Sequence, residues 1–255
     1  MKFLKDNNFN AIRFLFNHET VLHDMTLEPP NEAKYGRGAP WEAPELERYK
    51  YLDMFVKLAE VAAEHGVLVM MACHRLNKDA WPGDGLWFDK TTTEQRVLDS
   101  WSKVAAKLCS QWNVFAVRAR VRVLRGRAQR WGMKHTPLTH ASCVSSLAQV
   151  DLQNEPHSAS WAKGDPATDW GQAAGRIGNH VLSKCPRWLI MVEGVGYHPG
   201  APGMDSGGAG IWWGENLAGA KVEPVLLDRP GKLVYTPHTY GPSVYMQSYA
   251  RAHAA

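Results

Sequence analysis

The sequence predicts an α/β fold in which parallel strands alternate with helices, and more specifically part of a (β/α)8 TIM barrel. Short apolar runs alternate along the chain with longer segments whose apolar residues recur at helical spacing. The apolar runs show no alternation with polar residues, which indicates strands that are covered on both faces. Polar and aromatic residues collect directly after these runs, as they do at the carboxyl ends of the strands in barrel enzymes.

Five strands are predicted, each from an apolar run bounded by polar or turn-forming residues. In chain order they are residues 11–16, 67–71, 150–153, 188–193 and 233–237. Three helices are predicted at residues 45–65, 93–112 and 166–184. Gly66 is expected to cap the first of these, and Pro166 lies near the first turn of the third. A closed barrel of this type needs eight strands, so we expect about strands two to six, with both ends of the barrel missing.

The residues that follow these strands are the candidate site residues. They are Asn17, His18, His74, Arg75, Asn154, Glu155, Glu193, His238 and Tyr240. Because parallel strands place their carboxyl ends at one edge of the sheet, we expect these side chains to approach one another there.

Tryptophan is frequent, with 11 residues in 255. A flat indole ring stacks well on the face of a sugar, whereas a buried one needs a partner for its N–H group. Trp101 and Trp170 lie on helix faces and are expected in the core. The tryptophans in loops after strands are expected to stack on sugars; they are Trp81, Trp87, Trp212 and Trp213.

Other features exclude several classes of protein. The four cysteines are widely spaced and form no CxxC pair, so neither a zinc site nor a disulfide framework is predicted. There is no apolar run long enough to span a membrane and no GxxxxGK pattern for a nucleotide. The first residues lack the apolar stretch and cleavage site of a signal peptide. We expect no metal and no cofactor.

Residues 117–149 do not fit the alternating pattern. They contain seven Arg or Lys residues and no acidic residue. Without them, 22 basic residues face 25 acidic ones and the net charge changes from +4 to −3. We expect one partial barrel domain over residues 1–255, interrupted by this segment, which we interpret as a translated intron. A basic nucleic-acid-binding arm is the alternative, and it is disfavoured because the segment interrupts a core strand.

Glu155 is the candidate for acid/base chemistry. Cleavage of a glycosidic bond uses two carboxyls, one that protonates the leaving oxygen and one that acts as nucleophile or activates water. The first must hold a proton near neutral pH, which calls for burial or a neighbouring negative charge. Glu155 follows an apolar strand, and the preceding Asn154 offers an amide that can bond a sugar hydroxyl.

Outside residues 117–149, the chain resembles glycoside hydrolase family 5, the cellulase family. The stretches that carry the resemblance occur in the family's order and spacing; they are FNAIRFLF, HGVLVMMACHRL, VDLQNEPH, WLIMVEGVGY, IWWGENLAG and LVYTPHTYGPSVYMQSY. The resemblance implies a (β/α)8 barrel that hydrolyses β-1,4-glucan with retention, through a glycosyl-enzyme.

The resemblance also implies residue roles. Glu155 would be the acid/base, and Asn154 would hold the sugar 2-hydroxyl. Arg13 would steady the nucleophile, although a purely structural ion pair is the alternative for it. The remaining substrate-binding residues implied are His74 in the sugar site, His238 and Tyr240 near the carboxylates, and Trp212 and Trp213 in the sugar cleft.

Two departures from the family pattern stand out. Ala72 occupies a position where members often carry an acidic residue, and the seventh-strand nucleophile falls beyond Ala255, so that the nucleophile is absent. Glu193 is a possible substitute, disfavoured because it ends the fifth strand rather than the seventh. Glu215 is read as a solvated side chain.

The leading interpretation is an extracellular, monomeric endoglucanase-like hydrolase whose fragment here is inactive. The alternatives are a non-catalytic carbohydrate-binding relative and a barrel hydrolase that acts on mannan or another β-glycan. Extracellular location rests on the resemblance alone. We expect no nucleic-acid partner and no membrane partner.

Overall fold

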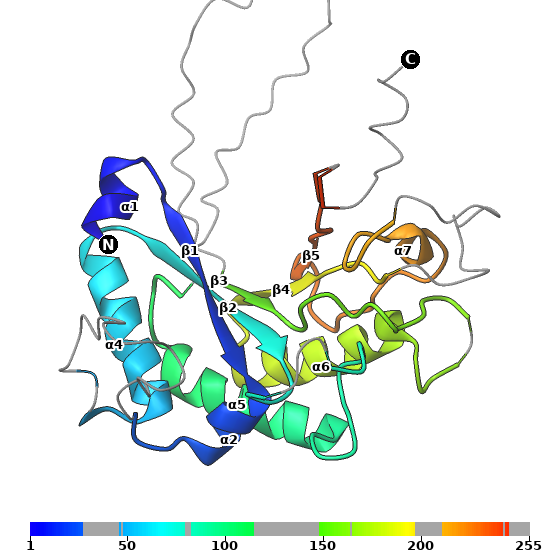
Figure 1. Ribbon diagram of the computed structural model, residues 1–255, viewed down its shortest axis with the longest axis horizontal. Helices are drawn as coiled ribbons and strands as arrows, with labels where there is room; N and C mark the ends of the chain where they lie inside the picture. The colour runs from blue at the N-terminus through cyan, green and yellow to red at the C-terminus, as the bar shows by residue number, and fades with distance from the viewer. Residues whose placement is uncertain are drawn as a thin grey trace, which may run out of the picture.

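A sheet of five parallel strands in the order β1-β2-β3-β4-β5 forms the centre of the molecule (Figure 1). The computed structural model describes residues 1–27, 46, 48–79, 83–114, 148–163, 165–196, 211–241 and 243–244. The strands are β1 (Ala11–Asn17), β2 (Leu68–Arg75), β3 (Ala148–Asp151), β4 (Trp188–Val192) and β5 (Leu233–Tyr235). Because neighbouring strands are parallel and follow chain order, all five carboxyl ends lie at one edge of the sheet, and the α/β prediction is confirmed.

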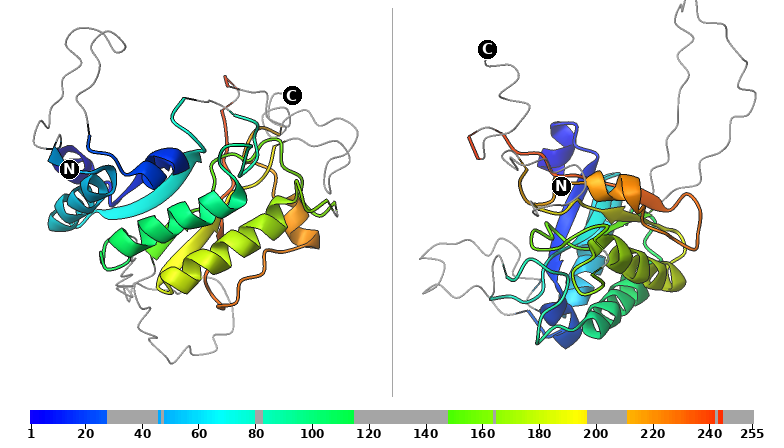
Figure 2. Two further views of the ribbon diagram at one scale, coloured as in Figure 1. Left: turned by 90° about the horizontal axis from the view of Figure 1, so that it is seen from below. Right: turned by 90° about the vertical axis from the view of Figure 1, so that its right-hand side faces the viewer.

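The helices are α1 (Lys2–Asp6), α2 (His18–His23), α4 (Tyr51–Glu64), α5 (Glu94–Leu108), α6 (Trp170–Lys184) and α7 (Ala218–Val222). The three long helices, α4, α5 and α6, lie side by side on one side of the sheet (Figures 1 and 2). The connections between successive parallel strands cross over there, as in one wall of a barrel. Among the described residues, no helix is both long and apolar enough to cross a membrane.

Caps set the helix ends more narrowly than the apolar pattern predicts. The Thr93 side chain accepts a hydrogen bond from the Arg96 amide, so α5 begins where predicted, but it ends at Leu108 rather than at residue 112. Asp169 accepts from the Gln172 amide, and α6 therefore begins at Trp170 rather than at residue 166. Gly66 follows α4 with φ of +67°, a left-handed conformation that favours glycine, as predicted.

Tryptophans fill the space between the sheet and the helices. Trp101 and Trp170 are fully buried, as predicted. The prediction for Trp87 is wrong, because this side chain is only 1% exposed and cannot stack on a sugar. Its ring packs 5.9 Å from that of Trp170, and its indole N–H donates to Glu94 at 2.8 Å. Trp81 lies outside the described residues.

Cys109 and Cys185 form a disulfide bond, which corrects the expectation of no disulfide framework. Each cysteine is the residue directly after a helix, Cys109 after α5 and Cys185 after α6. These helices pack side by side, so their ends meet although 76 residues separate the two cysteines. A disulfide that closes a loop of this length typically contributes about 2–4 kcal/mol to stability.

The predicted insertion at 117–149 lies outside the described residues, apart from its last two positions. Ala148 and Gln149 form the start of β3, opposite Trp188 and Leu189 of β4. On the side that faces β2, Val114 pairs with Val69 and Val150 pairs with Met71. Along β2 only one position, Met70, separates these partners, whereas 35 residues lie between Val114 and Val150 in the sequence.

Deleting residues 116–149 is therefore expected to leave a folded protein of equal or greater stability. Phe115 would fill the single position opposite Met70 and join Val114 to Val150. Removing a loop of about 35 residues lowers the entropic cost of closure by up to roughly 3 kcal/mol. Urea unfolding followed by circular dichroism would measure the change.

The matched control is deletion of residues 117–149, the segment predicted from the sequence. This deletion keeps Ala116 as one additional residue, which β3 can accept only as a β-bulge, so we expect the lower stability of the two. Loss of folding in both deletion variants would contradict the insertion interpretation.

Candidate active site

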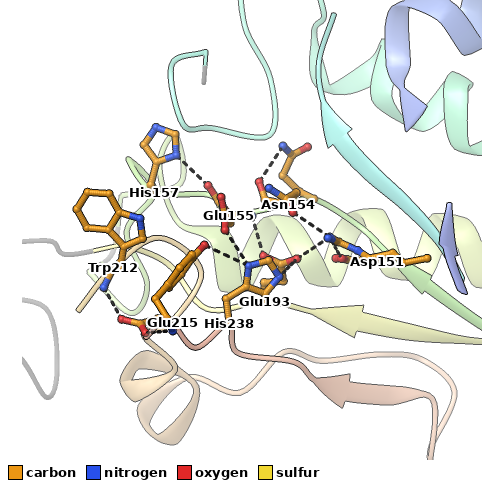
Figure 3. A network of polar contacts seen from close by, with 11 residues as sticks. Asp151, Asn154, Glu155, His157, Glu193, Trp212, Glu215 and His238 are labelled. Atoms are coloured by element: carbon orange, nitrogen blue, oxygen red, sulfur yellow. Dashed lines mark hydrogen bonds and ion pairs between the residues drawn. The ribbon is translucent and has the colours of Figure 1, made fainter. Parts of the chain in front are cut away.

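Polar residues from four strands meet at the carboxyl edge of the sheet (Figure 3). Arg13 lies on β1, Glu155 follows β3, Glu193 directly follows β4, and His238 follows β5. The expectation that residues after successive strands lie together therefore holds for this group.

Arg13 is an ion-pair partner of two buried carboxyls. Its Nη2 donates to Asp151 Oδ2, to Glu193 Oε1 at 3.0 Å and to Asn154 Oδ1 at 2.9 Å. The Asp151 and Glu193 side chains are 4% and 1% exposed, so each needs a charged or hydrogen-bonded partner. Burial and the charge of Glu193 raise the pKa of Asp151 well above its usual range, against the opposing effect of Arg13.

Glu155 adopts a left-handed backbone conformation, with φ of 47°. For a residue other than glycine this costs about 1–3 kcal/mol unless the surroundings hold it. The Glu155 amide donates to Glu193 Oε2 at 2.7 Å, and the Glu155 carboxyl is bonded through Oε1 to His238 Nδ1 at 2.9 Å. The side chain is 12% exposed, so its carboxyl reaches the surface of the site.

His238 lies between two carboxyls. Its Nδ1 contacts Glu155 Oε1 and its Nε2 contacts Glu193 Oε1, each at 2.9 Å. Burial alone would lower the pKa of His238, but the hydrogen bonds and charges of Glu155 and Glu193 outweigh it and raise the pKa from 6.5 to about 10. The Tyr240 hydroxyl lies 3.5 Å from Nδ1, so His238 and Tyr240 are both placed beside Glu155 as the resemblance implies.

Gly214 packs against the side chains of Glu155, Glu193 and His238. Its φ is +77°, and a Cβ there would lie 3.0 Å from Glu193 Oε2 and 3.3 Å from both Glu155 Cγ and His238 Cγ. Its carbonyl accepts from the amides of Gly194 and His238, at 3.0 Å each. The glycine thus lets the 212–216 loop close over the carboxyl cluster, a contact that sequence spacing does not reveal.

Three parallel rings stand beside the cluster. His157 stacks on Trp213 with ring centroids 3.8 Å apart, and Trp213 stacks on Trp212 at 5.4 Å. Glu215 accepts from the Trp212 amide at 2.5 Å and from the Tyr240 amide at 3.3 Å (Figure 3). The prediction that Glu215 is simply solvated is therefore wrong. Its carboxylate joins the backbone of Trp212, one of the stacked rings, to the backbone of Tyr240 after β5.

His74 and Asn154 line a pocket next to Glu155, together with His157 and the 83–86 turn. Burial, followed by the charges of Arg13 and Arg75, lowers the pKa of His74, so its ring is neutral near pH 7. Asn154 is buried, and its Nδ2 has no hydrogen-bond partner among the described residues. An unpaired donor of this kind is suited to a ligand hydroxyl.

His18 does not belong to the site, although it follows β1. Its side chain is fully buried, with Nδ1 2.9 Å from Ser100 Oγ and Nε2 3.0 Å from Cys73 Sγ. Burial lowers the pKa of His18 to about 3, which makes it a neutral core residue. Within the described ranges, no group of three or more His, Cys, Asp or Glu side chains is arranged to hold a metal ion.

The chain is similar to known proteins in both sequence and fold. Residues 146–254 match the model of the family described as "Cellulase (glycosyl hydrolase family 5)". An endoglucanase of Paenibacillus polymyxa is 30% identical over 96% of this chain and 50% of its own length. The major extracellular endoglucanase of Xanthomonas campestris is 31% identical over 94% of this chain and 40% of its own length.

Among solved structures, the hyperthermophilic endocellulase of Pyrococcus horikoshii superposes with a TM-score of 0.73 at 30% identity. The superposition covers 99% of this chain and 60% of the endocellulase chain. A variant of that endocellulase was also solved with cellotetraose, and it superposes with a TM-score of 0.70. This chain thus spans about half the length of the relatives it matches in sequence. The family match, the endoglucanase relatives and the agreement of fold with the endocellulase together show that the chain belongs to glycosyl hydrolase family 5, the cellulase family, and that its sheet is part of a (β/α)8 barrel.

Proposed function

We propose that this chain carries the acid/base half of an active site that cleaves β-1,4-glucan from within the polymer, with Glu155 as the acid/base. The observation that supports this most is the placement of a surface-reaching carboxyl, hydrogen-bonded to His238, beside stacked aromatic rings. The relatives are endoglucanases, and cellotetraose binds the archaeal endocellulase, which favours a β-1,4-linked glucan as substrate.

In this proposal the side chains divide the work as follows. Glu155 gives its proton to the glycosidic oxygen as the bond to the anomeric carbon breaks, and later takes a proton from the attacking water. Asn154 donates its unpaired Nδ2 hydrogen to a sugar hydroxyl. The column formed by Trp212, Trp213 and His157 gives the sugar ring a flat surface, as expected for a glucan subsite.

A retaining mechanism also requires a nucleophilic carboxylate about 5–5.5 Å from the acid/base. Glu193 does not suit this role, because its side chain is 1% exposed and its oxygens are bonded to Arg13, His238 and the Glu155 amide. Glu215 is occupied by two backbone amides. We therefore place the nucleophile outside the described residues, and expect the 255-residue chain alone to bind glucan far better than it cleaves it.

We also propose that the protein is extracellular and monomeric. The Cys109–Cys185 disulfide supports the first part, because such bonds persist mainly in oxidising compartments. One of the relatives is named as an extracellular endoglucanase.

Calorimetric titration with cellotetraose, paired with a reducing-sugar assay, tests the proposed function. The assay is run with and without azide, a small anion that can attack the anomeric carbon in place of a missing carboxylate. We expect binding, and cleavage that azide increases. Binding with no cleavage under either condition would favour the non-catalytic sugar-binding alternative. Preference for mannotetraose would favour a mannan-acting relative, and the absence of binding to either sugar would contradict the proposal.

A further inference from the structure

The Glu193 carboxylate contacts three different parts of the site. Its carboxylate accepts from Arg13, from His238 Nε2 and from the backbone amide of Glu155. Its own backbone carbonyl accepts from the Trp170 indole at 3.0 Å, which fixes the end of β4 against α6. Arg13 supplies an ion pair, and the two further contacts join the Glu193 carboxylate to the backbone of Glu155 and to His238.

The first of these contacts stabilises the backbone of Glu155. The hydrogen bond from the Glu155 amide is charge-assisted and short, at 2.7 Å. It holds a residue whose φ of 47° would otherwise be unfavourable. The direction of the Glu155 side chain therefore depends on Glu193.

The second contact fixes the orientation of the His238 ring. Glu193 Oε1 lies 2.9 Å from Nε2 of His238 and accepts a hydrogen bond from it, which places a proton on that nitrogen. With Nε2 committed in this way, Nδ1 is the nitrogen that can exchange a proton with Glu155 Oε1, 2.9 Å away. A carboxylate that orients an imidazole toward a reacting group is a recurrent arrangement in catalytic sites.

We propose that Glu193 is a positioning residue of the site, which acts on Glu155 by holding its backbone and by directing Nδ1 of His238 toward its carboxyl. This role rests on the proposed function, in which Glu155 is the acid/base. Glu193 itself does not touch substrate, since it is buried beneath Glu155 and Gly214.

The charges around His238 are consistent with this role. Glu155 and Glu193 face its two nitrogens, and the Tyr240 hydroxyl lies near Nδ1. Behind Glu193 lie Arg13 and Asp151, and the raised pKa of Asp151 means that it retains a proton where an ordinary aspartate has lost it.

Imidazole NMR of the full 255-residue chain tests the proposal without any glucan. In the unsubstituted protein both nitrogens of His238 should stay protonated until the pH approaches about 10. The spectrum of His238→Gln identifies the resonance. Glu193→Gln keeps the shape but removes the charge, and should lower the pKa of His238 by roughly 1–3 units. Exchange of the Glu155 amide hydrogen should become at least about tenfold faster.

Two further variants separate positioning from a structural contribution. Asp169→Asn changes another fully buried carboxylate, which accepts from the Gln172 and Ala162 amides. It should lower stability and leave the pKa of His238 unchanged. Glu193→Asp keeps the charge with a shorter reach, and should retain the fold, speed Glu155 amide exchange and lower the His238 pKa less than Glu193→Gln does.

An unchanged His238 pKa in Glu193→Gln, or an equal decrease in Asp169→Asn, would overturn the positioning role. These readouts are independent of the proposed function. A chain that binds no cellotetraose but shows the expected pKa change would refute the glucanase proposal alone.

Discussion

Substitution of Glu155 by Gln is expected to lower the azide-supported cleavage of cello-oligosaccharides by about 10²–10⁴-fold, the usual contribution of a general acid. An unactivated sugar alcohol leaves poorly unless its oxygen receives a proton, and a glutamine amide has no acidic proton to give. Azide supplies the attacking electron pair and forms a glycosyl azide, so the assay isolates the proton-donor step. Binding of cellotetraose should change much less than cleavage, because the stacked rings and Asn154 remain.

The matched control for this substitution is Glu223→Gln, which makes the same charge change at an exposed position. We expect the control to cleave at the rate of the unsubstituted chain. If Glu155→Gln cleaved as fast as Glu223→Gln, Glu155 would not be the proton donor.

Substitution of Arg13 by Met is expected to destabilise the protein by about 3–5 kcal/mol, the usual cost of leaving buried carboxylates without their cation. Arg13 contacts both Asp151 and Glu193, and methionine can fill most of the volume but not pair with either. Urea unfolding at pH 7 measures the loss. The surface pair of Arg176 with Glu94 offers a control, since Arg176→Met should cost only about 0–1 kcal/mol.

The cost of Arg13→Met should also depend on pH. Because the pKa of Asp151 is raised in the folded state, that state binds more protons than the unfolded one above the ordinary pKa of Asp. Stability therefore decreases as the pH rises through this window. Arg13 acts to lower the pKa of Asp151, so its removal raises that pKa further and extends the pH range over which stability decreases. The destabilisation should therefore be larger at pH 7 than at pH 4. A pH-independent loss no larger than that of Arg176→Met would contradict the network described for Arg13.

Much of the fold follows from local sequence patterns. Each of the five strands is predicted from an apolar run, and the bounds differ from the predicted ones by at most four residues, at the end of β2, because burial on both faces leaves a clear signal. The start of α6 was harder to predict, since the side chain of Asp169 and not the apolar pattern decides it. The Cys109–Cys185 disulfide depends on the packing of two helices and has no local signature.

The site could be predicted only in part, because several of its contacts join residues that are far apart in the sequence. The position of Glu155, His238 and Tyr240 after strands brings them to one edge of a parallel sheet, which sequence order alone implies. The contacts of Glu193 with His238 and with the Glu155 amide are non-local and could not be inferred from spacing. The strand pattern gives no role to His157, although it lies only two residues after Glu155 in the same NEPH segment.

In the proposed function, the carboxyl at position 155 faces the glycosidic bond of a bound glucan. A crystal structure of the Glu155→Gln variant with cellotetraose tests it most directly, because the variant should bind the sugar without cleaving it. We predict a glycosidic oxygen about 2.6–3.2 Å from the substituted side chain, with a sugar ring against Trp212. Cellotetraose bound elsewhere on the molecule, with the 155 side chain facing solvent, would contradict the assignment.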